Sequence, residues 1–91
     1  MAVTVRVPLV LTRLTEGKKE VQVGASSVRD LVDRLDAAYP GLKSRLCDET
    51  GQIRQLLNFY VNEKDIRYLK GADTELEDGD LISIVPMMAG G

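Results

Sequence analysis

The sequence of 91 residues contains no histidine and a single cysteine, Cys47. Histidine is the commonest general base and the commonest metal ligand in proteins, so its absence removes both roles at once. Cys47 also has no histidine or second cysteine with which to form a catalytic pair, a thiolate zinc site or an internal disulfide. We therefore interpret Cys47 as a small core residue in a reducing compartment, with no support for a redox role.

Long apolar runs are also missing from the chain. No stretch approaches the length of a membrane span, and the first residues alternate like a strand rather than forming a secretory signal peptide. A net charge of −2, with 44% hydrophobic and 29% charged residues, is typical of a soluble globular protein. We expect one small cytoplasmic domain that binds no membrane.

The charge is unevenly distributed along the sequence. Residues 1–47 contain eight Lys/Arg and five Asp/Glu, whereas residues 48–80 contain four Lys/Arg and nine Asp/Glu. The chain has no basic stripe of the kind that binds a nucleic-acid backbone, so we expect no nucleic-acid partner. The acidic half favours either a basic protein surface as partner or a plain solvated surface.

Carboxylates are plentiful, but their spacing matches no known site. Five of them lie in residues 73–80, in an order that differs from an EF-hand loop. We interpret this segment as a solvated, turn-rich loop. No glycine-rich phosphate-binding motif is present either. The sequence thus predicts no metal site, no cofactor and no reaction catalysed by the chain itself, so any reacting group must be something other than a side chain.

Period-two alternation predicts the strands. In "VTVRVPLVL" alternate residues from Val3 to Leu9 lie on one side, and "KEVQV" returns after a turn at Gly17 to form a hairpin. Pro8 cannot donate a ladder hydrogen bond and should lie at an edge or a strand end. Three more strands are expected, in "RQLLNFYVN" (54–62), "IRYL" (66–69) and "LISIVP" (81–86), the last after a tight "DGD" turn.

The segment "SSVRDLVDRLDAAYPG" (26–41) predicts the main helix. Ser27 and Asp30 have the spacing of a capping box, and Pro40 followed by glycine ends the helix. Four apolar residues at i, i+3, i+4 and i+7 form one stripe. The stripe consists of Val28, Leu31, Val32 and Leu35. A short helical turn is expected at 42–46, which begins and ends with leucine.

The order β–β–α–β–β–β predicts the α+β class. We expect a mixed sheet of four to five strands with one main helix packed on one face. No internal repeat or domain boundary interrupts this pattern.

The end of the chain, "LEDGDLISIVPMMAGG" (76–91), resembles the end of the ubiquitin-like sulfur carriers of the MoaD/ThiS family. Those carriers have the β-grasp fold, whose element order matches the one predicted above. Two internal segments, "YPGLKSRL" (39–46) and "FYVNEKDIRYLKG" (59–71), are most similar to the CysO-like subgroup, which supplies sulfur for cysteine biosynthesis from O-phosphoserine. The resemblance therefore covers nearly the whole chain.

The resemblance implies a reaction at the C-terminal carboxylate of Gly91. An adenylyltransferase would activate this carboxylate with ATP and Mg, and a sulfur donor would then convert it to a thiocarboxylate. The chain would be a sulfur-carrying co-substrate rather than an enzyme. A synthase would accept the sulfur, either a cysteine-synthase-like enzyme, followed by a metalloprotease, or the large subunit of molybdopterin synthase.

Three roles within the family remain open, namely a carrier for cysteine biosynthesis, the small subunit of molybdopterin synthase, and a ubiquitin-like modifier joined to lysine. An interaction domain with an inert tail is the alternative from another class.

We predict a β-grasp domain over residues 1–86 and a flexible tail over residues 87–91. Glycine has no Cβ, so a tail that ends in two glycines fits a narrow channel in a partner. The tail consists of Met87, Met88, Ala89, Gly90 and Gly91.

The strand pattern also predicts a partner-binding surface. If Leu57, Phe59 and Val61 face the helix together with Ile82 and Ile84, the opposite face carries exposed apolar residues beside the tail. A register error of one residue would exchange the two faces. The predicted docking patch consists of Leu56, Tyr60, Leu81 and Val85.

Overall fold

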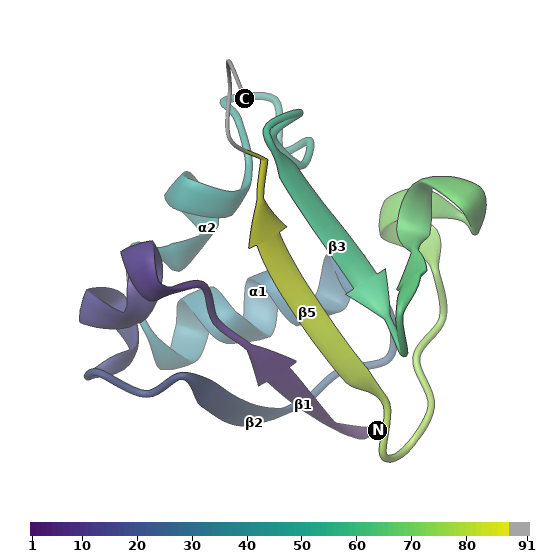
Figure 1. The fold of residues 1–91 in the computed structure, drawn as a ribbon, viewed down its shortest axis with the longest axis horizontal. Helices are drawn as coiled ribbons and strands as arrows, with labels where there is room; N and C mark the ends of the chain where they lie inside the picture. Colours follow the sequence, from purple (N-terminus) through teal and green to yellow (C-terminus); the bar gives the residue numbers. More distant parts are fainter. Residues whose placement is uncertain (88–91) are drawn as a thin grey trace.

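Five strands form one mixed sheet in the computed structural model, which describes residues 1–87 (Figure 1). The strands lie in the order β2-β1-β5-β3-β4. Neighbouring strands are antiparallel except β1 and β5, which are parallel. The mixed sheet predicted from the sequence is thus confirmed. The strands are β1 (Ala2–Arg6), β2 (Glu20–Gly24), β3 (Leu57–Val61), β4 (Lys64–Asp65) and β5 (Leu81–Pro86).

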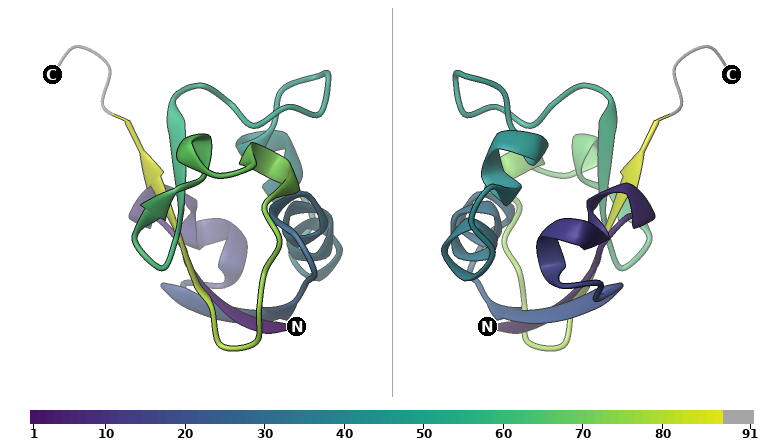
Figure 2. Two further views of the ribbon diagram at one scale, coloured as in Figure 1. Left: turned by 90° about the vertical axis from the view of Figure 1, so that its right-hand side faces the viewer. Right: turned by 90° about the vertical axis from the view of Figure 1, so that its left-hand side faces the viewer.

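The main helix, α1 (Val28–Ala38), covers one face of this sheet, so that sheet and helix form two layers (Figure 2). Ser27 is its N-cap, and its hydroxyl oxygen accepts a hydrogen bond from the Asp30 N–H at 3.1 Å. The Asp30 carboxylate accepts from the backbone N–H of Ser26 at 3.0 Å, one residue before the cap. The predicted capping interaction is therefore present, with its return bond displaced by one residue. A short α2 (Leu42–Leu46) follows, as expected from its two buried leucines.

The first strand is shorter than predicted. It ends at Arg6, and Leu9–Thr15 form the 3-10 helix η1, in which Leu9 is 72% exposed. The backbone N–H of Val7 still donates to Lys19 O at 2.8 Å. Pro8 has no N–H to donate, so the ladder stops there.

The prediction of a strand at "IRYL" was wrong. The strand β4 contains only two residues, and the chain continues as the 3-10 helices η2 (Ile66–Tyr68) and η3 (Gly71–Asp73). The Asp65 side chain accepts a hydrogen bond from Arg67 N at 2.9 Å and so caps η2. Such local side-chain bonds offer the backbone an alternative to the ladder.

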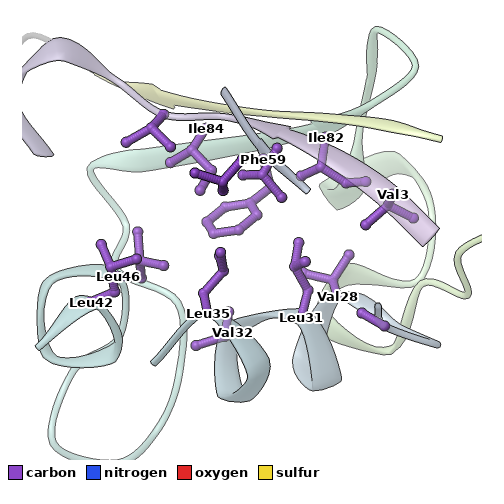
Figure 3. Packing of buried hydrophobic residues seen from close by; sticks show 14 of the residues in the cluster. Val3, Val28, Leu31, Val32, Leu35, Leu42, Leu46, Phe59, Ile82 and Ile84 are labelled. Atoms are coloured by element: carbon purple, nitrogen blue, oxygen red, sulfur yellow. The ribbon is translucent and has the colours of Figure 1, made fainter. Parts of the chain in front are cut away.

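The core lies between α1 and the sheet, with the Phe59 ring at its centre (Figure 3). Ile82 and Ile84 reach it from β5, and Leu31 and Leu35 reach it from α1. The β3–β5 register pairs Phe59 with Ile84, as the predicted inward set requires. The one-residue register error is thus excluded.

The central strand β5 begins after the turn at Asp78–Gly79 and ends at the predicted C-terminal tail. In this turn Gly79 has φ +85°, a conformation that favours glycine. The other end of β5 lies next to the start of β3 (Figure 1), and Met87 follows this end of the strand. No helix within residues 1–87 is long and apolar enough to cross a membrane.

Candidate functional site

The candidate site is the end of β5, where the predicted C-terminal tail begins. The backbone N–H of Met87 donates to Leu56 O at 2.7 Å, which extends the β3–β5 ladder by one residue. The Met87 side chain is 38% exposed. The sheet therefore holds the chain as far as the first residue of the predicted tail. The remaining tail residues, Met88, Ala89, Gly90 and Gly91, lie outside the described residues.

The predicted docking patch lies on the sheet face opposite α1, but its members are not equally exposed. Leu56 is 57% and Val85 is 43% exposed, whereas Tyr60 and Leu81 are half-buried. Leu56 and Val85 lie at the tail end of the sheet. Leu81 starts β5, four residues from Val85, or about 13 Å along a strand. The structure thus brings two of the four residues to the root of the tail and leaves Leu81 at the far end.

A buried polar residue, Asn58, lies on this outer face between the apolar residues. Its Nδ2 donates to the Tyr60 hydroxyl at 3.5 Å, a long contact. Its Oδ1 is buried and has no hydrogen-bond partner within residues 1–87. The Asn58–Tyr60 pair is therefore only partly satisfied in its hydrogen bonding.

An open groove of about 740 Å³ borders Met87, and the sequence patterns did not indicate it. Its lining comes from η1, from α2 and from the segment that precedes β3. We call it the tail groove. Its exposed apolar and cationic residues are Val10, Leu56, Met87, Arg13, Arg45 and Arg54. The predicted alternation placed Leu9 on the buried side of a strand, but in η1 both Leu9, at 72%, and Val10, at 68%, are exposed.

Cys47 lies away from this groove surface, at the C-terminal end of α2, with 4% of its surface exposed. Burial raises the pKa of its thiol above the ordinary value. The prediction that it packs in the core is confirmed.

The acidic segment 73–80 has structural partners. The Asp78 carboxylate accepts from Ala2 N at 2.7 Å. The Asp80 carboxylate accepts from Asn62 Nδ2 at 2.7 Å and from Glu77 N at 2.8 Å. These carboxylates order the turn before β5, in agreement with the turn-rich loop that was predicted. The described residues contain no group of three or more His, Cys, Asp or Glu side chains placed to hold a metal ion.

Comparison with known proteins agrees with the geometry. Residues 5–91 match the ThiS family. The chain is 37% identical to the sulfur carrier protein CysO of Mycobacterium tuberculosis, with 100% of each chain covered. It is 36% identical over 66 residues to small archaeal modifier protein 3 of Haloferax volcanii, which covers 72% of this chain and 71% of the relative.

Among solved structures, the fold is similar to that of one chain in the BexX/CysO complex from Amycolatopsis orientalis, with a TM-score of 0.91 and 36% identity. That match covers 98% of this chain and 99% of the other. The element order, the mixed sheet and the helix that covers one face are those of the ubiquitin-like β-grasp fold. The protein therefore belongs to the ThiS family.

Proposed function

We propose that this protein is a sulfur carrier whose sulfur is held on the C-terminal carbonyl of Gly91. The observation that carries the proposal is the 37% identity to CysO, which covers the whole of both chains. The placement of β5 supports it, because this central strand leads directly into the tail.

The chemistry consists of two substitutions. A carboxylate oxygen of Gly91 attacks the α-phosphorus of ATP, which forms the acyl-adenylate and releases pyrophosphate. Sulfide then attacks the acyl carbon, the bond from this carbon to the AMP oxygen breaks, and AMP leaves together with the sulfide proton, which yields the thiocarboxylate. Activation is needed because a carboxylate is a poor electrophile. The catalytic groups, ATP and Mg belong to the partner adenylyltransferase.

The fold suits a carrier because the sheet fixes where the tail begins. Strand β5 lies between β1 and β3, and the Met87–Leu56 hydrogen bond extends the β3–β5 ladder by one residue at the end of the strand. Four residues follow Met87, and four extended residues span at most about 14 Å. The domain can thus stay outside a partner while Gly91 enters its active site. In this proposal residues 1–86 are the docking domain and residues 87–91 are the tail.

For the recipient of the sulfur, we propose a cysteine-synthase-like enzyme that joins the carrier to an activated serine. A metalloprotease would then release cysteine and regenerate Gly91. The identity to CysO supports this pathway, and the BexX/CysO complex is a case in which a CysO protein binds another protein. The molybdopterin synthase large subunit is the alternative recipient.

A second candidate function is that of a protein modifier, joined through Gly91 to lysine. The likeness to a small archaeal modifier protein favours it specifically. Both functions share the adenylated intermediate and differ in the nucleophile that follows.

The test is an activation assay with ATP, the adenylyltransferase of the same organism and sulfide. Intact mass should show exchange of one oxygen for one sulfur. Deletion of Gly91 should abolish this exchange, because the carboxylate then lies about 3.5 Å short of the reaction centre, and catalysis is sensitive to misplacement of about 1 Å. Stability should stay nearly unchanged, since a terminal residue of this kind buries little surface. Normal thiocarboxylate formation by the shortened chain would refute the proposal.

Two tail variants complete this experiment. Gly90→Ala should fold normally and react slowly, because it adds a methyl group to the segment that enters the channel. Ala89→Gly keeps the tail length and removes a methyl group, so it serves as the control and should react normally. For the recipient, the thiocarboxylate form is mixed with the cysteine-synthase-like enzyme and O-phosphoserine. Stable co-purification with a molybdopterin synthase subunit, or isopeptide bonds to lysines of host proteins, would favour the alternatives.

A further inference from the structure

Arginines that form no ion pair among residues 1–87 gather at the tail groove. The chain contains seven arginines. Four of them, Arg6, Arg29, Arg34 and Arg67, form ion pairs with carboxylates. The other three, for which no ion pair occurs within residues 1–87, all line the tail groove. These are Arg13, Arg45 and Arg54, and all three are exposed.

The arginines come from three separate segments of the chain. Arg13 lies in η1 and Arg45 in α2. Arg54 precedes β3 and is held in place, because its Nη2 donates to Ser44 O at 2.9 Å. A charge cluster assembled by the fold is thus present at the place where the chain leaves the sheet.

Apolar side chains lie among these cations. Val10 is 68%, Leu56 is 57% and Met87 is 38% exposed. Protein interfaces combine an apolar centre with a polar rim and are enriched in arginine and methionine. Leu56 belongs to the predicted docking patch, so the tail groove continues that patch around the end of the sheet.

The opposite end of β5 has the opposite charge. The carboxylates of Asp78 and Asp80 lie in the turn before this strand, and Met87 follows its last residue. An acidic partner surface therefore attracts the tail end of the molecule and repels the other end. Such complementarity orients an encounter before contact is made.

We propose that the tail groove is the docking site of the activating partner, and that this partner presents carboxylates around an apolar contact. The arginines then serve as specificity determinants, since a guanidinium binds a carboxylate through two parallel hydrogen bonds. This inference rests on the proposed function, because it takes the adenylating enzyme as the partner. It also differs from the expectation, drawn from the acidic half of the sequence, that a basic surface would bind.

The test compares two double variants with the same change in charge. The double variant Arg13→Glu with Arg45→Glu replaces two positive charges of the tail groove with negative ones. It leaves the hydrogen bond from Arg54 to Ser44 O intact. Lys64→Glu with Lys70→Glu is the control, because both lysines are exposed, form no ion pair within residues 1–87 and lie outside the groove. The readout is ATP–pyrophosphate exchange by the adenylyltransferase as the carrier concentration is varied.

The groove variant should raise KM for the carrier about tenfold at low salt with little change in kcat, since rim charges act on association. The control should change KM by less than about twofold. The difference should shrink at high salt, because the screening length falls from about 10 Å at 0.1 M to about 3 Å at 1 M. Equal effects of the two double variants would overturn the inference.

Binding is measured separately with the chain that lacks Gly91, which docks but does not react. Its titration against the same enzyme should show the same dependence on Arg13 and Arg45. Absence of exchange by the wild type would count against the sulfur-carrier function. Binding that is unchanged by the substitutions at Arg13 and Arg45 would count against the tail groove as the docking site. The remaining alternative is that the arginines hold the chain's own terminal carboxylate. Shifts of the arginine side-chain NMR signals on deletion of Gly91 from the free protein would show this and overturn the inference.

Discussion

At the scale of single residues, the residue that is proposed to carry sulfur is not the cysteine. Sulfur is proposed to travel on Gly91, while the one cysteine is buried in the domain. Nearby Lys43 lowers the pKa of the Cys47 thiol, but burial raises it by more. The thiolate is the reactive form of cysteine, so native Cys47 is kept unreactive.

The first prediction concerns this cysteine. Iodoacetamide should alkylate Cys47 much more slowly in the native protein than in denaturing urea, as measured by intact mass over time. Cys47→Ala should still form the thiocarboxylate. Rapid native alkylation, or loss of sulfur transfer in the variant, would contradict the assignment of Cys47 to the core.

The second prediction concerns Tyr60, which is half-buried on the outer sheet face. Tyr60→Glu should weaken binding to the activating enzyme while the domain stays folded, as judged by circular dichroism. Tyr60→Phe is the matched control. It removes only the long contact with Asn58, so its stability should lie within about 1 kcal/mol of the wild type. Unfolding by Tyr60→Glu would instead assign this side chain to the core.

At the scale of elements, the ends of helices and strands decide where the site forms. Pro8 ends β1, and η1 then turns the chain so that Val10 and Arg13 reach the tail groove. Because the hydrogen-bond ladder of β1 stops at Pro8, the following residues form η1 and line the tail groove instead of extending the strand.

The third prediction concerns the start of α1. Ser27→Ala should lower the unfolding free energy by about 1 kcal/mol, because the Asp30 N–H loses its cap. For a domain of this size, that corresponds to about 4–8 °C in Tm. Ser26→Ala is the control. Its hydroxyl makes only a 3.4 Å contact with Asp30, while its backbone N–H makes the shorter bond. Equal losses from both variants would show that the cap is not specific.

At the scale of the whole molecule, acid stability depends on carboxylates in three separate segments. The pKa of Asp30 is lowered chiefly by the Ser26 backbone N–H, that of Asp48 by the Thr50 hydroxyl, and that of Asp65 by the Arg67 side chain. In each case the folded state holds its proton less tightly than the unfolded state. Their contribution to stability is therefore complete above the ordinary pKa of 3.8 and is lost as pH falls through the lower folded values.

The fourth prediction is a fall in the urea midpoint below about pH 4. Between about pH 5 and 7 the midpoint should be nearly constant with respect to these groups. Asp48→Asn keeps an oxygen acceptor for Thr50 and removes one titrating group, so its midpoint should fall less steeply in acid. A midpoint that does not change between about pH 5 and 2 would contradict the assignment.

The sequence by itself determined the elements that have a regular apolar period. The stripe of α1 and the alternation of β3 and β5 were predicted in the correct register, because each period is set by local backbone geometry. The Asp78–Gly79 turn and the burial of Cys47 were also predicted correctly. The family was identified from residues near the end of the chain. The roles of Met88–Gly91 stay predictions, since those residues lie outside the described structure.

The tertiary structure decided which separate segments meet. No local pattern shows that β1 lies parallel to β5, or that Leu56 pairs with Met87. The segments at Leu9–Thr15 and Ile66–Tyr68 were misjudged, since Pro8 and the capping Asp65 outweighed their strand-like composition. Above all, the tail groove joins Arg13, Arg45 and Arg54. Whether a charge is paired depends on neighbours in space, and those neighbours exist only after the chain has folded.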